Sequence, residues 1–204
     1  MTLTLKSARP DARAFDLREL PRRLVRRHVR SLLQEPFLYS KSVSDNVRLG
    51  RQGASHDDVL GATRAAAVHD EVAGFEDGYD TLIGERGVRL SGGQRQRLSL
   101  ARGLLHDTTV LILDDALSAV DSWTEQVILD ALAVRRGRLT TVVIAHRLST
   151  LARVDRIAVL DHGRLVETGT HAELIARGGP YARLWSIQTD LEQEIAFETE
   201  ETAS

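Results

Sequence analysis

Cysteine does not occur among the 204 residues, which excludes disulfides and thiol chemistry. No apolar run approaches the roughly 18–20 residues needed to cross a bilayer. The longest runs, VLIL at 110–113 and VVIA at 142–145, have the length of buried strands. The first residues, MTLTLKSARPDARAF, lack the apolar core of a signal peptide, which argues against export. We therefore expect a location on the cytoplasmic side, with any membrane role exercised through a partner.

The chain also lacks a strong charge of either sign. Its 27 basic and 29 acidic residues leave a net charge of -2 at pH 7, so electrostatics offers no argument for a nucleic-acid partner, and none is predicted. Arginines 22, 23, 26 and 27 form a basic cluster that we interpret as a solvated helix face. The length suits one domain, with an α/β core and a helical insertion.

The N-terminal half predicts a strand followed by a group of helices. Residues 1–15 show no periodicity, so we expect a poorly ordered stump. A short basic helix is predicted within 16–28, and VRSLLQ at 29–34 predicts a strand that runs into a loop. Apolar residues at helical spacing predict a helical block over about 42–75, and SGGQRQRLSLARGLL at 91–105 predicts a helix opened by glycines.

The C-terminal half alternates between strand and helix patterns. Strands are predicted at 109–113, 140–145 and 156–160, and helices at 125–136, 148–154, 171–176 and 179–195. Such alternation predicts a parallel sheet covered by helices. His162 and Gly163 lie between two apolar runs and predict a hairpin turn. Residues 190–204 carry six acids and no base, which predicts a frayed acidic tail over 191–204.

The strand VLILDD at 110–115 ends in two carboxylates that could serve phosphate chemistry. Asp114 can hold Mg²⁺, and Asp115 can point at the water that attacks a terminal phosphate. Taken alone the pattern is weak, because strands ending in Asp also cap loops in many α/β folds.

The five residues LSGGQ at 90–94 are more specific. Ser91, Gly92 and Gly93 stand at a predicted helix N-terminus, where unpaired N–H groups favour an anion and glycine lets a phosphate approach the backbone. A plain glycine turn with a helix cap remains the alternative for these residues taken singly.

Together the motifs and their order resemble the nucleotide-binding domain of an ABC transporter of the exporter type, over residues 16–190. The matching segments are the Q-loop around Gln34, the X-loop GERG at 84–87, the signature LSGGQ at 90–94, Walker B at 110–114, the D-loop SAVD at 118–121 and the H-loop AHRLST at 145–150. The resemblance implies a P-loop NTPase (RecA-like) α/β fold, with a parallel sheet and a helical signature subdomain at about 42–105.

The sequence departs from the family pattern in two places. No GxxxxGK[ST] phosphate loop occurs, and the family's loop would lie about 40 residues before Gln34, so we expect a fold incomplete at the N-terminus. The usual catalytic Glu after Walker B is Asp115, whose carboxylate is about 1.5 Å short; displacement by about 1 Å can cost a hundredfold in rate. By resemblance, this substitution beside an intact signature marks the degenerate-site half of a heterodimer.

The resemblance implies a role for each matching residue. Catalysis falls to Asp115, His146 and Gln34, and Asp114 and Gln34 contact Mg²⁺. The signature contacts an ATP on a partner domain, and the D-loop couples the two sites of a head-to-tail dimer. These partner-facing residues are Ser91, Gly92, Gly93, Gln94, Ser118 and Asp121.

The implied cofactors are ATP and Mg²⁺, and the implied partners are a second nucleotide-binding domain and the transmembrane domains of an exporter. The resulting location is the cytoplasmic face of the cell membrane. Two alternatives stay open: a hydrolysis-incompetent module that offers its LSGGQ to a partner's ATP, and a gene remnant without function.

Overall fold

The computed structural model describes residues 16, 18–34, 36–84, 87–145 and 147–202. The chain divides into two compact units, residues 2–144 and residues 145–204, and each is described by itself. The stump predicted at 1–15 lies outside the described residues.

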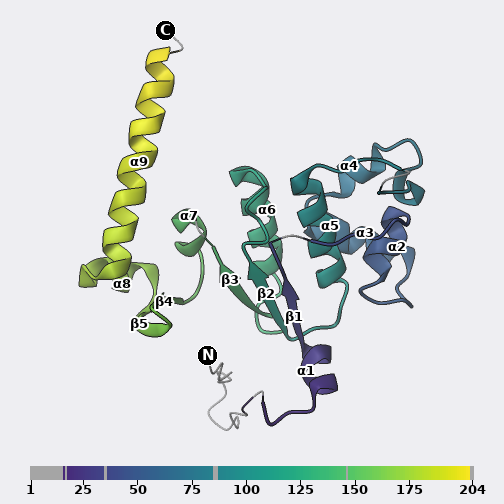
Figure 1. Cartoon of the computed structure of the whole chain (residues 1–204), viewed down its shortest axis with the longest axis horizontal. Coiled ribbons are helices and arrows are strands. Elements are labelled where there is room, and N and C mark those ends of the chain that lie inside the picture. The colour runs from purple at the N-terminus through teal and green to yellow at the C-terminus, as the bar shows by residue number, and fades with distance from the viewer. Residues whose placement is uncertain (1–15, 17, 35, 85–86, 146, 203–204) are drawn as a thin grey trace. The chain divides into compact units, whose positions relative to one another are not determined.

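A three-stranded parallel sheet forms the centre of the first unit (Figure 1). Its strands are β1 (Val29–Leu32), β2 (Val110–Asp114) and β3 (Thr140–Ile144), with β2 in the middle. Leu111 and Leu113 of β2 are almost fully buried, as expected for a central parallel strand that is covered on both faces. The α/β parallel sheet expected from the sequence is therefore confirmed, and the carboxyl ends of all three strands lie at one edge.

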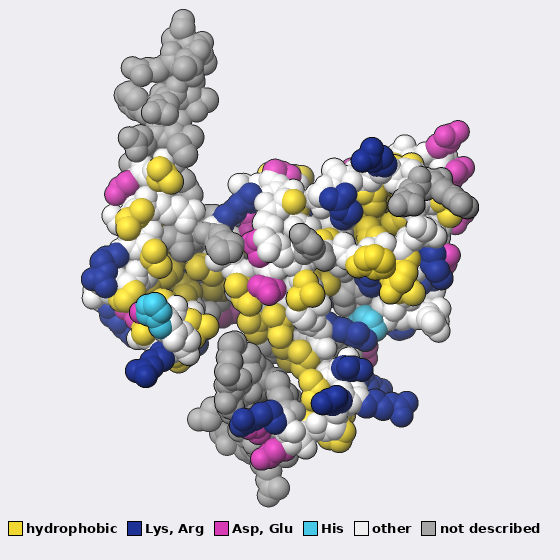
Figure 2. Space-filling view, in the orientation of Figure 1, with side chains coloured by type: hydrophobic (Ala, Val, Ile, Leu, Met, Phe, Trp, Pro, Cys, Tyr) yellow, Lys and Arg dark blue, Asp and Glu magenta, His cyan; other side chains and the backbone are white. Residues whose placement is uncertain are grey.

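The helices next to the sheet are α1 (Arg22–His28), α5 (Gly92–Leu104) and α6 (Ser122–Ala133). Helix α6 begins three positions before the predicted residue 125, because the side chain of Asp121 caps it by accepting from the Thr124 N–H at 2.9 Å. Edge strand β3 is only partly covered, and Ile144 at its end is 48% exposed. Figure 2 shows apolar side chains on the surface over these strands.

The helical block of the first unit comprises α2 (Val43–Arg48), α3 (His56–Ala65), α4 (His69–Ala73), the 3-10 helix η1 (Gly78–Asp80) and α5. Helix α3 begins with a capping box in which Ser55 and Asp58 satisfy each other's backbone N–H groups. The valines of α2 and α3 and the leucines of α5 belong to one buried cluster, which continues into β2 and α6. The predicted helices of this region are confirmed.

The second unit contains α7 (Leu148–Leu151), β4 (Ile157–Asp161), β5 (Arg164–Gly169), α8 (His171–Arg177) and α9 (Pro180–Thr202). The predicted turn is confirmed: His162 and Gly163 both have positive φ, 44° and 76°, as a tight hairpin requires. The parallel pairing expected for the strand at 156–160 is wrong, because β4 pairs antiparallel with β5. The two-residue turn brings β5 back beside β4, so β4 forms its backbone hydrogen bonds with β5, the next strand along the chain.

Helix α9 continues to Thr202. The backbone of residues 191–202 is therefore helical, whereas the acidic composition predicted a frayed tail. The division of the chain at residue 190 stays a prediction. None of the described helices has an apolar stretch long enough to cross a membrane.

Candidate functional site

The first two site residues lie where β2 ends. Asp114 is the last residue of β2 and its side chain is exposed, although the preceding Leu113 is 1% exposed. Asp115 adopts a φ of +51°, a region that Asp tolerates better than most residues. The N–H of Asp115 donates to the carbonyl of Ile144 at 3.0 Å, which ties the turn to the neighbouring strand β3.

Gln34 and Asp115 meet at this edge of the sheet. The side-chain amide of Gln34, two residues beyond β1, donates to Oδ2 of Asp115 at 3.0 Å. The two residues are 81 positions apart, and they come together because β1 and β2 are parallel neighbours whose carboxyl ends coincide. The structure thus joins two of the three residues that the resemblance implied for catalysis. The third, His146, lies outside the described residues, as do Glu85 and Arg86 of the X-loop.

Helix α5 presents the signature residues at its N-terminus. Ser91 and Gln94 form a capping box, with Ser91 Oγ accepting from the Gln94 N–H at 3.2 Å and Gln94 Oε1 accepting from the Ser91 N–H at 2.9 Å. The amide of Gln94 also donates to Glu71 of α4 at 2.9 Å, and Arg97 forms a 2.6 Å ion pair with the same carboxylate. The helix N-terminus is therefore held against α4.

The two signature glycines lie against the D-loop. A methyl group on Gly93 would come within 2.8 Å of the carbonyl oxygen of Ala119, and one on Gly92 would meet the methyl of Ala119 at 3.4 Å. Glycine at 93 thus has a packing reason within this chain, beside the close approach of a phosphate that the sequence suggested.

The D-loop residues have local partners. Ser118 Oγ donates to the carbonyl of Asp115 at 2.9 Å and so closes the turn that follows β2. Asp121 accepts from the N–H and the hydroxyl of Thr124, and these hydrogen bonds lower the pKa of its carboxyl group. Its place as a helix cap does not test the coupling role implied by resemblance.

Sequence reasoning missed Gln96, which joins these parts. Its side chain is 6% exposed and contacts Gln34, Ser118 and Ala119. A signal was available, because Gln96 stands four and eight residues before Leu100 and Leu104, on the buried face of α5. A polar residue on such a face needs hydrogen-bond partners.

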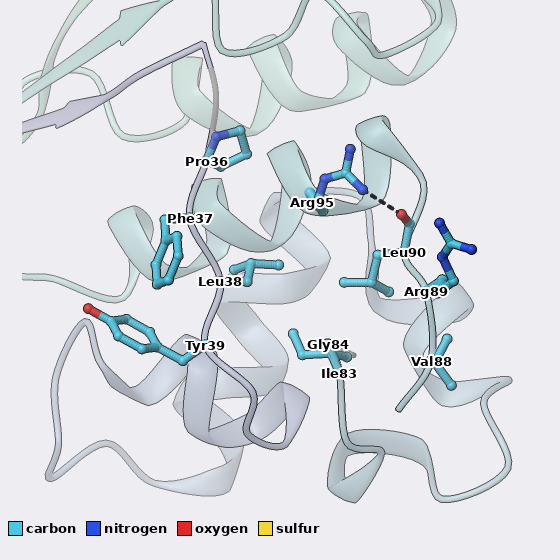
Figure 3. A pocket seen from close by; sticks show the side chains of 10 residues that line it. All are labelled: Pro36, Phe37, Leu38, Tyr39, Ile83, Gly84, Val88, Arg89, Leu90 and Arg95. Carbon is cyan, nitrogen blue, oxygen red and sulfur yellow. Dashed lines mark hydrogen bonds between the residues drawn. The ribbon is translucent and has the colours of Figure 1, made fainter. Parts of the chain in front are cut away.

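A groove lies beside these residues on the first unit (Figure 3). Its volume is about 650 Å³, and one wall is the segment 36–39, in which the rings of Phe37 and Tyr39 pack edge to face at 4.9 Å. Phe37 is 68% exposed. The opposite wall includes Ile83 and the segment 88–90, where Arg95 donates to the Leu90 carbonyl at 2.7 Å.

Arg102 of α5 and the buried Asn46 of α2 support the first wall. The guanidinium of Arg102 donates to the carbonyl of Phe37 at 2.9 Å and to both oxygens of Asn46. Asn46 in turn exchanges two hydrogen bonds with the backbone of Tyr39. Burial lowers the pKa of Arg102. The groove is thus attached to the signature helix by hydrogen bonds.

Two features define the class of this chain. A parallel sheet carries Asp114 and the Gln34–Asp115 pair at its carboxyl edge, and it is joined to a helical block in which a helix opens with glycines. This combination defines an α/β nucleotide-binding domain with a helical subdomain. The sequence profile of the ABC transporter family matches residues 7–118, which is more than half of the chain. The chain belongs to the ABC transporter family.

Individual relatives agree with this assignment. Over 176 residues the chain is 47% identical to ABC transporter B family member 19 of Arabidopsis thaliana, and over 164 residues it is 47% identical to a putative multidrug export ATP-binding/permease protein of Staphylococcus aureus. The structure of a bacterial Atm1-family ABC exporter with ATP bound superposes with a TM-score of 0.80 at 41% identity and covers 85% of this chain. The chain spans 14%, 28% and 30% of these three proteins, in that order.

Proposed function

We propose that this chain is the ATP-handling part of an ABC exporter, coupling the binding and hydrolysis of ATP to transport across a membrane. The observation that carries the proposal is the convergence of Asp114, Asp115 and Gln34 at the carboxyl edge of a parallel sheet, where open α/β sheets bind their ligands. The family and the export proteins among the relatives support it.

The proposed cofactors are ATP and Mg²⁺. Mg²⁺ prefers oxygen ligands and is commonly bound by one or two carboxylates together with substrate phosphates, and it neutralises charge that develops on those phosphates. The exposed carboxylate of Asp114 suits such an ion. Gln34, whose amide donates to Asp115, is proposed to contact Mg²⁺ and to orient that carboxylate, and Asp115 is proposed to accept a hydrogen bond from the attacking water. His146 is proposed as the residue that contacts the terminal phosphate.

The proposed first partner is a second nucleotide-binding domain, bound head to tail. Ser91 is exposed at the N-terminus of the 13-residue helix α5, where the helix dipole favours an anion. The signature would contact an ATP held by that partner, with Ser118 and Asp121 of the D-loop at the same interface. Asp115 in place of Glu favours a heterodimer, in which this chain carries the slower of two sites.

The proposed second partner is the transmembrane part of the exporter. The groove between segment 36–39 and residues 83, 84 and 88–90 exposes Phe37 and Tyr39, aromatic residues of the kind that anchor interfaces. We propose that a short helix from the transmembrane part occupies this groove. The groove wall is hydrogen-bonded to the signature helix through Arg102, so a contact in the groove would also act on that helix. This attachment would hold the chain at the cytoplasmic face of the cell membrane.

The proposal is tested on the complex that contains this chain. The chain would be tagged at its C-terminus in its source cell, purified from detergent-solubilised membranes with its partners, and assayed for Mg²⁺-dependent ATP hydrolysis. We expect Asp114→Asn to lower turnover by at least tenfold, although this chain carries the slower site. The variant removes the carboxylate proposed to hold Mg²⁺, and with it one of the two ATP molecules proposed to hold the head-to-tail dimer together, on which the faster site of the partner also depends. Asp107→Asn is the matched control, since Asp107 is exposed and precedes β2 at the other end of the strand. Equal turnover in the two variants would overturn the proposal.

Asp115 in place of the usual Glu also favours a second candidate function, that of a module which does not hydrolyse ATP itself. If the chain only offers its signature to a partner's ATP, Asp114→Asn would leave turnover near normal while Ser91→Arg would abolish it. The same purified complex separates the two functions, because the first requires both variants to fail.

A further inference from the structure

Four residues form a closed ring of hydrogen bonds. The Gln34 amide donates to the Asp115 carboxylate at 3.0 Å, and Ser118 Oγ donates to the Asp115 carbonyl at 2.9 Å. The amide of Gln96 then donates to Ser118 Oγ at 3.2 Å and to the Gln34 carbonyl at 3.4 Å. The ring therefore links the segment after β1, the turn after β2, the D-loop and helix α5.

Gln96 closes this ring with its side-chain nitrogen, and its side-chain oxygen also has a hydrogen-bond partner. Its Oε1 accepts from the N–H of Ala119 at 3.0 Å. Ala119 is also the residue against which Gly92 and Gly93 pack, so α5 contacts the D-loop through both a side chain and a bare backbone. A buried amide costs free energy unless both its donor and its acceptor find partners, and here both do.

We propose that Gln96 is a positioning residue for the reaction at this site. The effect of Gln96 on the reaction rests on the proposed function, whereas the hydrogen bonds of Gln96 do not. Gln96 holds helix α5, whose N-terminus presents Ser91, in a fixed register with the Gln34–Asp115 pair. A shift of the segment around Gln34 would therefore move the signature helix with it, which connects the ATP site of this chain to the surface offered to a partner.

Three features favour this role over ordinary core packing. The position lies on the same helical face as Leu100 and Leu104, where an apolar residue would be expected. The partners of Gln96 are one backbone carbonyl, one hydroxyl and one backbone N–H from two separate segments. Each segment also carries a residue that the site uses, namely Gln34 in the first and Ser118 in the second.

The first experiment measures amide hydrogen exchange on the full chain without nucleotide. Gln96→Met keeps the length of the side chain but removes its donor and its acceptor, and Gln96→Glu keeps an acceptor. We expect the Ala119 amide to exchange roughly tenfold faster in Gln96→Met and to stay protected in Gln96→Glu, because a lost hydrogen bond of ordinary strength changes an opening equilibrium by about that factor.

Two references show whether the change is local. The amide of Val43, which donates to the Thr81 carbonyl at 3.0 Å elsewhere in the same unit, should keep its rate. Gln52→Met, at an exposed position, is the matched control and should change neither amide. Unchanged exchange at Ala119, or equal acceleration at Ala119 and Val43, would overturn the proposal.

The second experiment uses ATP hydrolysis by the purified complex. A positioning role predicts that Gln96→Met lowers kcat about tenfold with little change in KM for ATP, and that Ser118→Ala, which breaks the same ring from the exposed side, lowers kcat in the same direction. Normal kcat in both variants, with altered exchange, would show that the ring is structural only. A wild-type complex without ATP hydrolysis would refute the proposed function instead, because the exchange result does not depend on it.

Discussion

Gly93 provides a sharp test of how the signature helix meets the D-loop. Replacing a helical glycine by alanine in open space stabilises a protein by about 0.5–1 kcal/mol, because alanine loses less backbone entropy on folding. At Gly93, however, the new methyl would lie 2.8 Å from the carbonyl oxygen of Ala119, whereas an ordinary contact begins at 3.4 Å. Overpacking of this kind typically costs about 1–3 kcal/mol. We therefore expect Gly93→Ala to lower the free energy of unfolding by on the order of 1 kcal/mol.

Two other glycines serve as matched controls. Gly61 lies within α3 with no heavy atom within 4 Å of its added methyl, so Gly61→Ala should stabilise by about 0.5–1 kcal/mol. At Gly92 the methyl would meet Ala119 at an ordinary 3.4 Å, so Gly92→Ala should fall between the two. All three glycines belong to the first unit, so a single transition reports on them.

The assay is urea unfolding followed by far-ultraviolet circular dichroism. The predicted order of midpoints is Gly61→Ala above Gly92→Ala above Gly93→Ala, with a spread of about 2 kcal/mol between the extremes. A Gly93→Ala variant as stable as Gly61→Ala would refute the reasoning, because it would mean that the D-loop carbonyl does not abut the helix.

Further predictions concern a histidine and a buried asparagine. Burial, together with the charges of Arg30 and Arg51, lowers the pKa of His106 from 6.5 to about 4. The unfolded chain therefore binds the proton first, so stability should fall as the pH is lowered from about 6.5 to about 4, and His106→Gln should flatten this dependence in urea unfolding at a series of pH values. An unchanged slope would contradict it. Asn46→Ala should cost about 1–3 kcal/mol in the same assay at pH 7, because it removes a buried amide and leaves the part-buried backbone N–H and carbonyl of Tyr39 without this partner. Loss of less than half a kcal/mol would show that water replaces the amide.

Local patterns in the sequence predicted most of the elements. The apolar run at 110–113 became the central strand β2, and the helical spacing after LSGGQ became α5. The two patterns differ because a strand buried on both faces is apolar at every position, whereas a helix buried along one stripe repeats its apolar residues every three or four positions. Element ends were less well predicted. The start of α6 is set by the Asp121 cap, which the helical spacing did not indicate. Helix α9 continues to Thr202 through an acidic segment that the composition predicted to be frayed.

Pairing was the part that periodicity could not predict. The strand at 156–160 has the same apolar character as those in the sheet, yet it pairs antiparallel with β5, since strand character does not specify a partner. The His162–Gly163 pair between two apolar runs was the better guide, because a two-residue turn with positive φ at both positions joins antiparallel strands.

The sequence by itself determined which chemical groups this protein carries: carboxylates at the end of an apolar strand, glycines at a helix N-terminus and a glutamine after another strand. Only the tertiary structure decided that Gln34 lies 3.0 Å from Asp115, that Gln96 joins both to the D-loop, and that Gly93 touches Ala119. The physical reason is one of range. Motifs and periodicities act over a few residues, whereas contacts across 62 or 81 positions depend on how strands align and how closely helices pack.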